Sequence, residues 1–585
     1  MMNKKLRFCS FVLATVFTLG ACSAPKEEVK TKAKEQKSTV KSDDINEYSL
    51  RDKNALYDMH DPSEIVTMYL TVSRGNEGEN TDHSWEEINT YSAYDYDEMG
   101  VDRYKVEGLL QVGDENGPKK GEVGYNQLSP NCTIQIRGQT SSLNAQKNYK
   151  ISLKENKGTW RGQSTIALNK HQGDGLRYRN KMVYDLITGI DQMMGLRTTF
   201  VHLYVKDTTS GSSVFKDYGL YTQVEQLNKT ALKAHGLDKN GHLYKINYCE
   251  FYRYEDVIKL KDESGYDIKA FEEILEVKGS DDHKKLIKML DEVNDYSYPM
   301  EKVLEKHFDI ENLSYWMAFH ILMGNIDTQS RNFYIYSPLH SDKWYILTWD
   351  NDASLKRTEY KLMNRIDGGG WESGVSNYWG NVLFQRCLKT EVFRKALDKA
   401  MEDLKGYLNK ERIDSISLKY KNLLKPIIYS MPDSMHEHLS QSQYDIVAKS
   451  ISGEIDTNYK LYKESFEKPM PFFIGIPQKN GGKLSFVWDN SYDFNRENVT
   501  YTFELSKSLS FASPIAKHEN LNIAAVQTDM LPAGQYFIRV TATNESGKSM
   551  PAFDYYISEN GKNYGVMCFY VNQKGEIVED VYVES

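Results

Sequence analysis

Two short acidic stretches carry the clearest chemical pattern in this sequence. Asp327 stands five residues before Asn332, and Asp350 follows eighteen residues later, two positions before Asp352, at the end of an apolar run. In kinase-type phosphoryl transfer, the first acid of such a set accepts the proton of the attacking hydroxyl, and the amide and the later acid hold Mg²⁺. Magnesium prefers oxygen ligands. The spacing therefore predicts Asp327 as the catalytic base and Asn332 and Asp350 as metal ligands.

The elements that must position these side chains can be read from periodicity. Residues 310–325 carry apolar side chains at helical spacing and end in Gly324-Asn325, a helix stop signal. Residues 333–336 and 344–349 predict two strands joined by a turn. The order helix, acidic loop, hairpin, acid pair matches the catalytic and metal-binding loops of a kinase. The alternative, that these acids are solvated turn residues, is not excluded by the local pattern.

A second candidate region lies upstream, where strand 132–136 runs into the turn 137–142. A turn rich in glycine and hydroxyl residues can present backbone N–H groups to phosphates. Lys147, at the start of the next strand, could reach the same phosphates as a point charge, although a plain hairpin with surface lysines gives the same pattern. Arg137, Gly138 and Lys147 are therefore candidate nucleotide-binding residues.

The remaining pattern predicts two lobes. Residues 64–72, 200–205 and 218–224 read as strands, the last leading into Glu225, whereas residues 179–194 read as a helix. Residues 76–102 form a polar, acidic stretch, within which 95–100 favour a hairpin tip over a calcium loop. Residues 60–230 are thus mainly β and residues 230–465 mainly helical. A cleft between two such lobes suits a nucleotide.

After Pro469 the pattern changes to short strands with glycine turns, at 484–488, 501–505 and 535–543. Residues 534–544 look like the late strands of a fibronectin type III domain, so residues 469–556 are expected to form a small β-sandwich that spaces or binds rather than catalyses. Residues 557–585 are expected to add a C-terminal hairpin.

The N-terminus predicts export. A basic start and a short apolar stretch lead to Leu19-Gly20-Ala21-Cys22, which matches the bacterial lipobox, so residues 1–21 are expected to be a lipoprotein signal peptide and Cys22 the lipidated residue. Residues 22–47 are rich in Lys and Glu and predict a flexible tether. The expected location is the outer face of the cell membrane, held by a lipid anchor; an ordinary cleaved signal would release the protein instead.

Composition narrows the function further. The net charge is −9, from 73 basic and 82 acidic residues that are well mixed, so no nucleic-acid partner is expected. Cys132, Cys249, Cys387 and Cys568 are scattered, without the spacing of a zinc site or a disulfide framework. We expect most of them to be single buried thiols.

Taken in order, six motifs over residues 62–405 resemble the spore coat protein H (CotH) kinase-like family. They are Arg137-Gly138-Gln139-Thr140-Ser141-Ser142 with Lys147 and Tyr149, Leu176 to Lys181, Asp217-Tyr218-Gly219-Leu220-Tyr221 running to Glu225, Gly324-Asn325-Ile326-Asp327 with Asn332, Trp349-Asp350-Asn351-Asp352, and Asn381-Val382-Leu383-Phe384-Gln385-Arg386 before Val392-Phe393-Arg394.

The resemblance implies an α+β chain with an atypical two-lobed protein-kinase-like fold over residues 48–468, followed by the small β-sandwich. It implies transfer of the ATP γ-phosphate to Ser or Thr hydroxyls of a spore-coat or cell-surface protein, with Mg²⁺ or Mn²⁺. Asp327 matches the catalytic acid, Asn332 the amide of the same loop, and Asp350 and Asp352 the metal-binding acids. Lys147 matches the basic residue on the phosphates.

Two departures from the family pattern leave alternatives open. Ala145-Gln146 stands where the family often has Pro-Lys, and the helix 179–194 holds no Glu to pair with Lys147. Asp185 is the only acid near the middle of that helix and Glu225 lies on a following strand, so the acid that pairs with Lys147 stays open. Because ATP is scarce outside most cells, an inactive surface-binding platform on the same scaffold is one alternative. Transfer of AMP on the same fold is another.

Overall fold

We describe the protein from a computed structural model, in which residues 49–364, 370–559 and 561–580 are described. The predicted signal peptide, Cys22 and the tether lie outside the described residues. The fold is α+β, as predicted: a large sheet comes first, then a mainly helical region with a smaller sheet, then a β-rich module. None of the helices described has the length and apolar composition that a membrane crossing requires.

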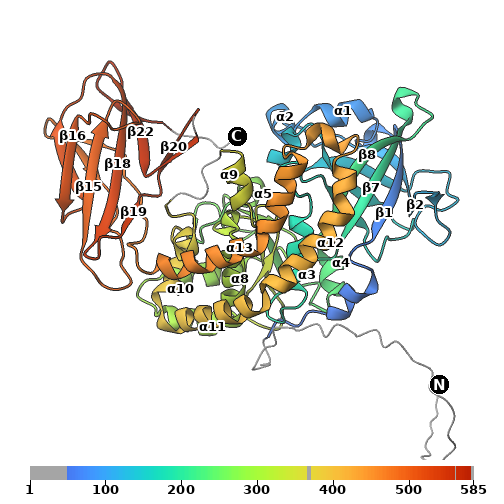
Figure 1. Cartoon of the computed structure of the whole chain (residues 1–585), viewed down its shortest axis with the longest axis horizontal. Helices are drawn as coiled ribbons and strands as arrows, with labels where there is room; N and C mark the ends of the chain where they lie inside the picture. Colours follow the sequence, from blue (N-terminus) through green and yellow to red (C-terminus); the bar gives the residue numbers. More distant parts are fainter. Residues whose placement is uncertain (1–48, 365–369, 560, 581–585) are drawn as a thin grey trace, which may run out of the picture. The chain divides into compact units, whose positions relative to one another are not determined.

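The first sheet has eight strands in the order β1-β7-β8-β6-β5-β4-β2-β3, and β1 also pairs with β2, so seven of its strands close into a ring. In Figure 1, β1, β7 and β8 run side by side in this region. The strands are β1 (Ile65–Ser73), β2 (Val106–Asp114), β3 (Gly117–Pro118), β4 (Cys132–Arg137), β5 (Asn148–Leu153), β6 (Thr165–Asn169), β7 (Thr198–Asp207) and β8 (Lys216–Glu225).

Alternation of side chains fixes which face of this sheet is buried. In β4, Cys132, Ile134 and Ile136 are buried and the residues between them are half-buried, and β2 follows the same pattern. Because successive side chains of a strand point to opposite faces, the apolar set fills one core while Arg137 lies on the other face. This second face is the one that meets the rest of the protein.

Two predictions in this region are corrected. The helix expected over 179–194 is shorter, since α3 (Arg179–Ile187) ends at Thr188, whose hydroxyl donates to the Asp185 carbonyl. Residues 95–100 are not a hairpin tip but belong to α2 (Ala93–Met99) and its C-cap Gly100, and α1 (Trp85–Thr90) precedes this helix. Ser84 and Ser92 cap these helices in capping boxes. The signal for both was present in the sequence, a serine followed three residues later by an acid.

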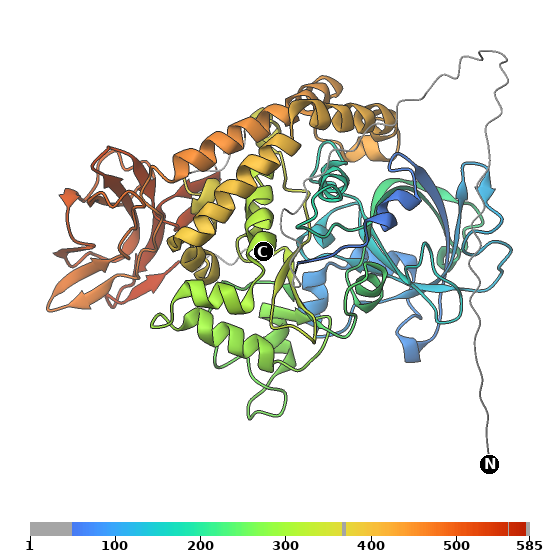
Figure 2. The same cartoon turned by 90° about the horizontal axis from the view of Figure 1, so that it is seen from below.

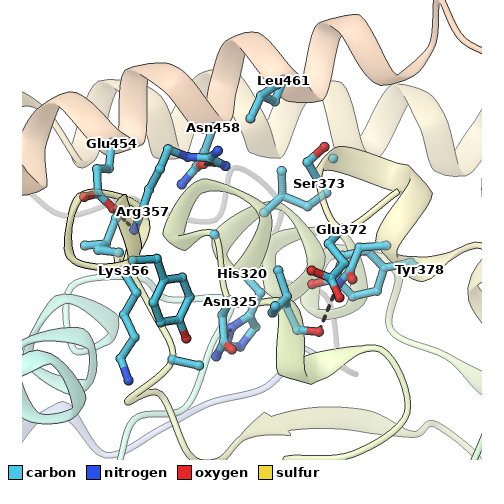
Figure 3. Close-up of a pocket in the computed structure, with 18 residues that line it drawn as sticks. His320, Asn325, Lys356, Arg357, Glu372, Ser373, Tyr378, Glu454, Asn458 and Leu461 are labelled. Carbon is cyan, nitrogen blue, oxygen red and sulfur yellow. Dashed lines mark hydrogen bonds between the residues drawn. The ribbon is translucent and has the colours of Figure 1, made fainter. Parts of the chain in front are cut away.

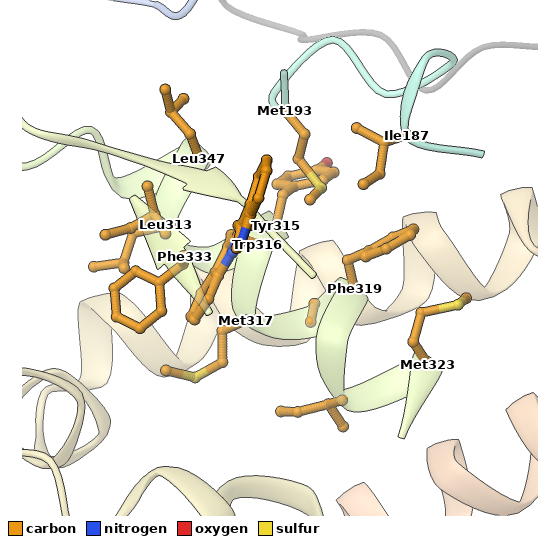
Figure 4. Packing of buried hydrophobic residues seen from close by; sticks show 14 of the residues in the cluster. Ile187, Met193, Leu313, Tyr315, Trp316, Met317, Phe319, Met323, Phe333 and Leu347 are labelled. Carbon is orange, nitrogen blue, oxygen red and sulfur yellow. The ribbon is translucent and has the colours of Figure 1, made fainter. Parts of the chain in front are cut away.

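The helical region is organised around α8 (Ile310–Met323), which is apolar on almost every side and has twelve buried residues. Figure 4 shows Trp316 of this helix beside Phe333 of β11, and their ring centroids lie 4.9 Å apart. The helix therefore forms the centre of the largest core, which fixes the loop that follows it.

The other helices cover α8, and α11 and α13 pack directly against it; the pair α12 and α13 is seen in Figure 2. The helices are α4 (Lys229–Ala234), α5 (Ile268–Ile274), α6 (Lys284–Asn294), α7 (Met300–His307), α9 (Arg357–Leu362), α10 (Val382–Lys389), α11 (Glu391–Tyr407), α12 (Lys410–Ile428) and α13 (Gln441–Ser465). A four-stranded sheet in the order β10-β9-β11-β12 lies among them. Its strands are β9 (His242–Ile246), β10 (Leu275–Val277), β11 (Phe333–Ser337) and β12 (Tyr345–Thr348).

The C-terminal module consists of two sheets that share one core, in which Phe486 of one sheet meets Phe503 and Phe569 of the other. One sheet is β13-β14-β17 and the other is β16-β15-β18-β22-β23, with β19 paired to β18. The strands are β13 (Gln478–Asn480), β14 (Lys483–Val487), β15 (Val499–Ser506), β16 (Ala516–Leu521), β17 (Ala525–Asp529), β18 (Gly534–Asn544), β19 (Ser549–Pro551), β22 (Val566–Val571) and β23 (Ile577–Glu579).

Two hairpins complete the module. The hairpin β20 (Tyr555–Ser558) and β21 (Gly561–Tyr564) stands outside the two sheets, whereas β22 and β23 extend the larger sheet through the pairing of β22 with β18. The four cysteines of the described chain, Cys132, Cys249, Cys387 and Cys568, are buried free thiols, which confirms that prediction.

Candidate active site

The hairpin β11–β12 brings two of the predicted metal ligands to one place. Phe333, the first residue of β11, is the cross-strand partner of Thr348, the last residue of β12. Asn332 and Asp350 therefore flank the same end of the hairpin. Both have left-handed backbones, with φ of +62° and +54°. Asn and Asp tolerate this conformation better than other non-glycine residues, which explains a turn away from the strands at both positions.

Asp327 lies in the short helix η5 (Ile326–Thr328) that follows α8 and Gly324. The Asn325 side chain accepts from the Asp327 amide at 3.3 Å and so caps this turn. The carboxylate forms an ion pair with Arg331 at 3.3 Å and is 39% exposed. It is close enough to Asp350 for its charge to raise the pKa of that residue. Asp327 is thus accessible and adjacent to the hairpin end.

The two acids after β12 are in different electrostatic environments. Burial, followed by the charge of the neighbouring Asp352 carboxylate, raises the pKa of Asp350 well above its usual range. For Asp352, burial acts in the same direction, but the hydrogen bond from His171 and the charge of Lys356 outweigh it and lower the pKa. Asp352 is therefore the permanent anion of the pair, and Asp350 is the acid that a cation would stabilise most.

His171, in the segment before α3, and Asn180, in the first turn of α3, fix this acid pair. Asn180 Oδ1 accepts from the Asn351 amide at 3.1 Å, and its Nδ2 lies 3.1 Å from His171 Nε2. His171 Nδ1 lies 3.2 Å from Asp352 Oδ2. The Asn180 amide nitrogen donates to His171 Nε2, which leaves Nδ1 to donate its proton to Asp352. Asn180 and His171 thus orient the two acids by hydrogen bonds.

A buried ion network supports this segment. Arg179 NH1 bonds the carboxylate of Asp174 and lies 2.6 Å from that of Glu359, and all three side chains are at most 1% exposed. Arg179 Nε also donates to the Leu355 carbonyl at 3.0 Å. The start of α3 is thereby tied to the chain just after Asp352. Removing one member would leave a buried charge without its partner, which is strongly destabilising.

Arg137, the last residue of β4, brings a cation from the first sheet to the acids that follow β12. The Arg137 guanidinium lies 5.9 Å from the centre of the Trp349 ring, within the range of a cation–π contact. Burial lowers the pKa of Arg137, and the charge of Asp350 opposes that shift. Arg137 therefore lies close to the residues that follow β12.

Two lysines that sequence reasoning missed join Arg137. Lys150 pairs with Gln135 in the β4–β5 register, which places it on the same face as Arg137. Lys245 pairs with Tyr334, whose ring meets Trp349 edge-on at 5.5 Å. Burial lowers the pKa of both lysines, and the charge of Glu276, which forms an ion pair with Lys245 at 3.7 Å, opposes this shift in each. Lys278 lowers the pKa of Lys150 further, and Arg137 lowers that of Lys245. Strand alternation was the signal that could have found Lys150.

Lys147 and Gly138, both predicted to bind nucleotide, have other contacts. The Lys147 ammonium donates to the Ser142 carbonyl at 2.6 Å, and burial lowers its pKa, with Asp95 the nearest acid that counters this. Gly138 has φ of +88°, and a Cβ there would lie 2.1 Å from Ser141 Oγ, so only glycine fits this turn. Lys147 and Gly138 thus shape the loop 137–143 from inside.

Glu225 lies away from the other candidates. Glu225 is the cross-strand partner of Ile166, and Ile166 is the partner of Ile151 in β5. Lys147 lies just before the first residue of β5, so Glu225 is not opposite it. Its carboxylate instead bonds Arg197 at 2.5 Å and His235 at 2.9 Å. Glu225 is therefore part of a separate buried ion network and does not pair with Lys147.

Residues 325–332, which hold Asp327 and Asn332, form the candidate catalytic loop. A narrow cavity lies beside the start of this loop (Figure 3). It is lined by His320, Asn325, Lys356, Glu372 and Tyr378, among others. Its volume of about 40 Å³ has room for a few water molecules. None of the predicted catalytic or metal-binding acids lines it.

The donor set around the hairpin end suits magnesium. Asp350 and Asp352 offer carboxylate oxygens and Asn332 an amide oxygen, and Mg²⁺ is usually held by one or two carboxylates together with substrate phosphates and water. The raised pKa of Asp350 shows that its charge is poorly compensated. Within the described residues, no cluster of three or more His, Cys, Asp and Glu has the arrangement of a complete metal site. A cation here would depend on the nucleotide for the rest of its shell.

Comparison with known proteins identifies relatives of this chain. The family model described as CotH kinase protein matches residues 134–462, more than half of the chain. The inner spore coat protein H of Bacillus subtilis (strain 168) is 23% identical over 294 residues, which cover 49% of this chain and 75% of that protein.

Two solved structures show weaker likeness. The proinflammatory kinase CtkA of Helicobacter pylori aligns with a TM-score of 0.25 and 11% identity over 54% of this chain and 94% of that one. HipA of Shewanella oneidensis MR-1, from a complex with HipB and operator DNA, aligns with a TM-score of 0.23 and 9% identity over 51% and 59%. Likeness at this level supports no statement about function.

Proposed function

Because the chain belongs to the CotH kinase protein family, we propose that it is a kinase that transfers the γ-phosphate of ATP to Ser or Thr hydroxyls of a protein. The observation that supports this most is the convergence at one end of the β11–β12 hairpin. Asp327, Asn332 and Asp350 gather there, and Arg137 faces them across Trp349. An accessible acid, oxygen ligands and facing cations are the groups that phosphoryl transfer needs.

In this proposal Asp327 is the general base. The acceptor hydroxyl oxygen forms a bond to the γ-phosphorus while the bond from that phosphorus to the β–γ bridging oxygen breaks, and ADP leaves. The hydroxyl proton passes to a carboxylate oxygen of Asp327. Its 39% exposure allows an acceptor to approach, and the Asn325 cap fixes its backbone. Positioning and charge compensation supply most of the rate.

The nucleotide phosphates would lie beside Arg137 and the acids that follow β12. Arg137, Lys150 and Lys245 are cations near this place, and Arg137 and Lys245 also feel the charge of Asp350. Lys245 is paired with Glu276 at 3.7 Å, an ion pair that the phosphates would compete with. Asp350, Asp352 and Asn332 would hold Mg²⁺ or Mn²⁺, which would offset the phosphate charge when bound. Lys147, which bonds Ser142, would act on the phosphates only through the loop 137–143.

A labelling experiment tests this function. Purified full-length protein is incubated with γ-labelled or α-labelled ATP and Mg²⁺ or Mn²⁺, with dephosphorylated casein as a generic acceptor, beside Asp327→Asn as the matched inactive control. Label from γ-ATP alone, lost in the variant, supports the kinase. Nucleotide binding without transfer of either label would instead support a binding platform on the same scaffold.

Transfer of AMP is the second candidate, because Lys147 differs from the usual kinase lysine. Its ammonium bonds a backbone carbonyl instead of a carboxylate, so the phosphate-binding arrangement departs from the common kinase pattern. A nucleotide in another orientation in the same cleft would present its α-phosphate to the acceptor. Label from α-ATP in the same experiment identifies this activity.

The proposed location is the outer face of the cell membrane, held by a lipid on Cys22. This rests on the lipobox sequence and on the relative named as an inner spore coat protein. The proposed substrates are correspondingly spore-coat or cell-surface proteins that carry accessible Ser or Thr hydroxyls.

A further inference from the structure

The segment 371–381, which contains η6 (Gly374–Tyr378), holds the catalytic loop from behind. It lines the cavity of Figure 3, where Glu372 and Tyr378 lie on the same side. Side chains of the segment bond three positions of the loop. They are Asn377 Nδ2 to the Ile326 carbonyl at 3.3 Å, Tyr378 OH to Thr328 Oγ1 at 2.9 Å, and Asn381 Nδ2 to the Gln329 carbonyl at 2.9 Å.

The same segment is bound on its other side by the C-terminal module. Glu372 is 7% exposed, and its two carboxylate oxygens each bond a residue of β21. Oε1 lies 2.7 Å from Lys562 Nζ, and Oε2 accepts from Tyr564 OH at 2.7 Å. A buried carboxylate with two charge-compensating or hydrogen-bonding partners is held in one orientation. The module therefore fixes the start of the segment.

An aromatic cage reinforces this contact. The Lys562 ammonium lies 3.8 Å from the ring centre of Tyr555, 5.3 Å from that of Tyr564 and 5.4 Å from that of Trp371. Cation–π contacts on several rings, combined with Glu372, locate this lysine tightly. Trp371 also meets Phe553 edge-on at 5.2 Å. The cage thus joins the module to the residue next to Glu372.

The chain after Pro469 also contacts the end of the segment 371–381. Trp379 stacks on Tyr492 at 5.3 Å and meets Phe494 at 5.6 Å. Met550 and Phe553 of the module belong to the same hydrophobic core as α8. The residues between the two sheets of the module form a separate core. One edge of the module is therefore part of the core that contains α8.

We propose that the C-terminal module is part of the catalytic unit and that Glu372 is a positioning residue, which transmits the hold of Lys562 and Tyr564 through the segment 371–381 to the catalytic loop. The proposal rests on the proposed function for its kinetic readout. It changes the expected role of the module from spacing or binding to keeping Asp327 in its working position. Small displacements of a catalytic group lower the rate of transfer without loss of nucleotide binding.

A double-mutant cycle tests the contact. Glu372→Gln and Lys562→Met remove the two charges with little change in shape, and each is expected to lower kcat about tenfold, while the Kd for Mg²⁺·ATP stays within twofold. The double variant is expected to fall no further than either single one, since both disable the same link. The control is the exposed pair Lys483 and Asp529, 2.6 Å apart on the module; Lys483→Met and Asp529→Asn should change neither constant.

A readout independent of activity separates this proposal from the proposed function. Hydrogen exchange of the amides of residues 325–331 should be faster in Glu372→Gln than in the wild type, and Tyr564→Phe, a milder change, should give a smaller increase in the same amides. If the wild type transfers no label, the proposed function fails while this comparison still holds. Unchanged exchange in both variants, additive losses of kcat in the cycle, or a parallel loss of nucleotide affinity would each overturn the positioning role.

Discussion

At the scale of single residues, the candidate site depends on acids of the same type in different surroundings. Asp327 is partly exposed and paired with Arg331, whereas Asp350 is held beside Asp352 and faces Arg137. Side-chain type alone does not distinguish a candidate base from a candidate metal ligand. Solvent exposure favours Asp327 as the base, and the neighbouring carboxylate of Asp352 favours Asp350 as the metal ligand.

The two acids are expected to respond differently to substitution. Asp327→Asn should leave metal-dependent ATP affinity unchanged and lower transfer by ~10² to 10⁴, as for loss of a general base. Asp350→Asn should weaken the Mg²⁺-dependent part of ATP binding, because it removes a charge from the cation. Calorimetric titration with and without Mg²⁺, together with initial rates, separates the effects. Wild-type affinity in Asp350→Asn would remove this residue from the site.

Lys150 and Lys245 give a second residue-scale prediction. Lys150→Ala and Lys245→Ala should each weaken ATP binding about tenfold, near 1.4 kcal/mol, because both lie close enough to Arg137 to interact with its charge. Lys147→Ala should instead lower the unfolding midpoint, since it removes the bond to the Ser142 carbonyl. Affinity and thermal unfolding of the three variants are compared. A larger affinity loss for Lys147→Ala than for the other two would restore the phosphate role inferred from the family.

At the scale of elements, buried charges lock the first segment of the described chain to the sheet. His235, at the end of α4, lies 2.6 Å from Asp52 and 2.9 Å from Glu225 at the end of β8, and its side chain is fully buried. Although burial opposes it, the hydrogen bonds to Asp52 and Glu225 raise the pKa of His235 to about 9. Hydrogen bonds from His235 and Arg197 likewise outweigh burial and lower the pKa of Glu225 to about 2.

This network predicts a pH dependence of stability. A histidine whose pKa is raised on folding adds stability that is complete below about pH 6.5 and is lost as the pH rises through about 9. Glu225 adds stability that is present above about pH 4.5 and is lost as the pH falls toward 2. His235→Asn should therefore be less stable than the wild type at pH 6 by about 3–5 kcal/mol, and the difference should narrow toward pH 9. Urea unfolding at both pH values measures it.

The control for this prediction is His202→Asn, which removes a partly exposed pair with Asp217. Exposed pairs contribute little to stability, about 1 kcal/mol or less. If the destabilisation by His235→Asn were as large at pH 9 as at pH 6, the loss of packing and not the loss of a charged ring would explain it.

At the scale of the whole molecule, the proposed membrane anchor lies outside the described residues but can be tested directly. Cys22→Ala should lose acyl labelling and either stay unprocessed or leave the membrane fraction, because a lipid on this residue is the proposed attachment. Metabolic labelling with a fatty acid and cell fractionation decide it, with Cys132→Ala as a control at a buried thiol. Wild-type protein that stays with the membrane and carries no acyl group would contradict the prediction.

Local sequence determined the elements whose signals are local. The helix α8 ends at its Gly324 stop signal, the hairpin β11–β12 follows it, and the four cysteines are single buried thiols, all as periodicity and spacing predicted. Ser84 and Ser92 show that α1 and α2 were readable too, from their capping boxes. Hydrogen bonds and side-chain periods within a few residues carry this information, so no knowledge of the fold is required.

Only the tertiary structure decided which residues meet. His171 reaches Asp352 across 181 positions and Glu372 reaches Lys562 across 190, and neither pair has a spacing that marks it. Lys147 and Glu225 matched family positions but bond Ser142 and Arg197. Burial is the physical reason, because a buried charge is costly unless it is paired. The partner is the residue that the packed sheets and helices place beside it. The neighbouring sequence does not specify that residue.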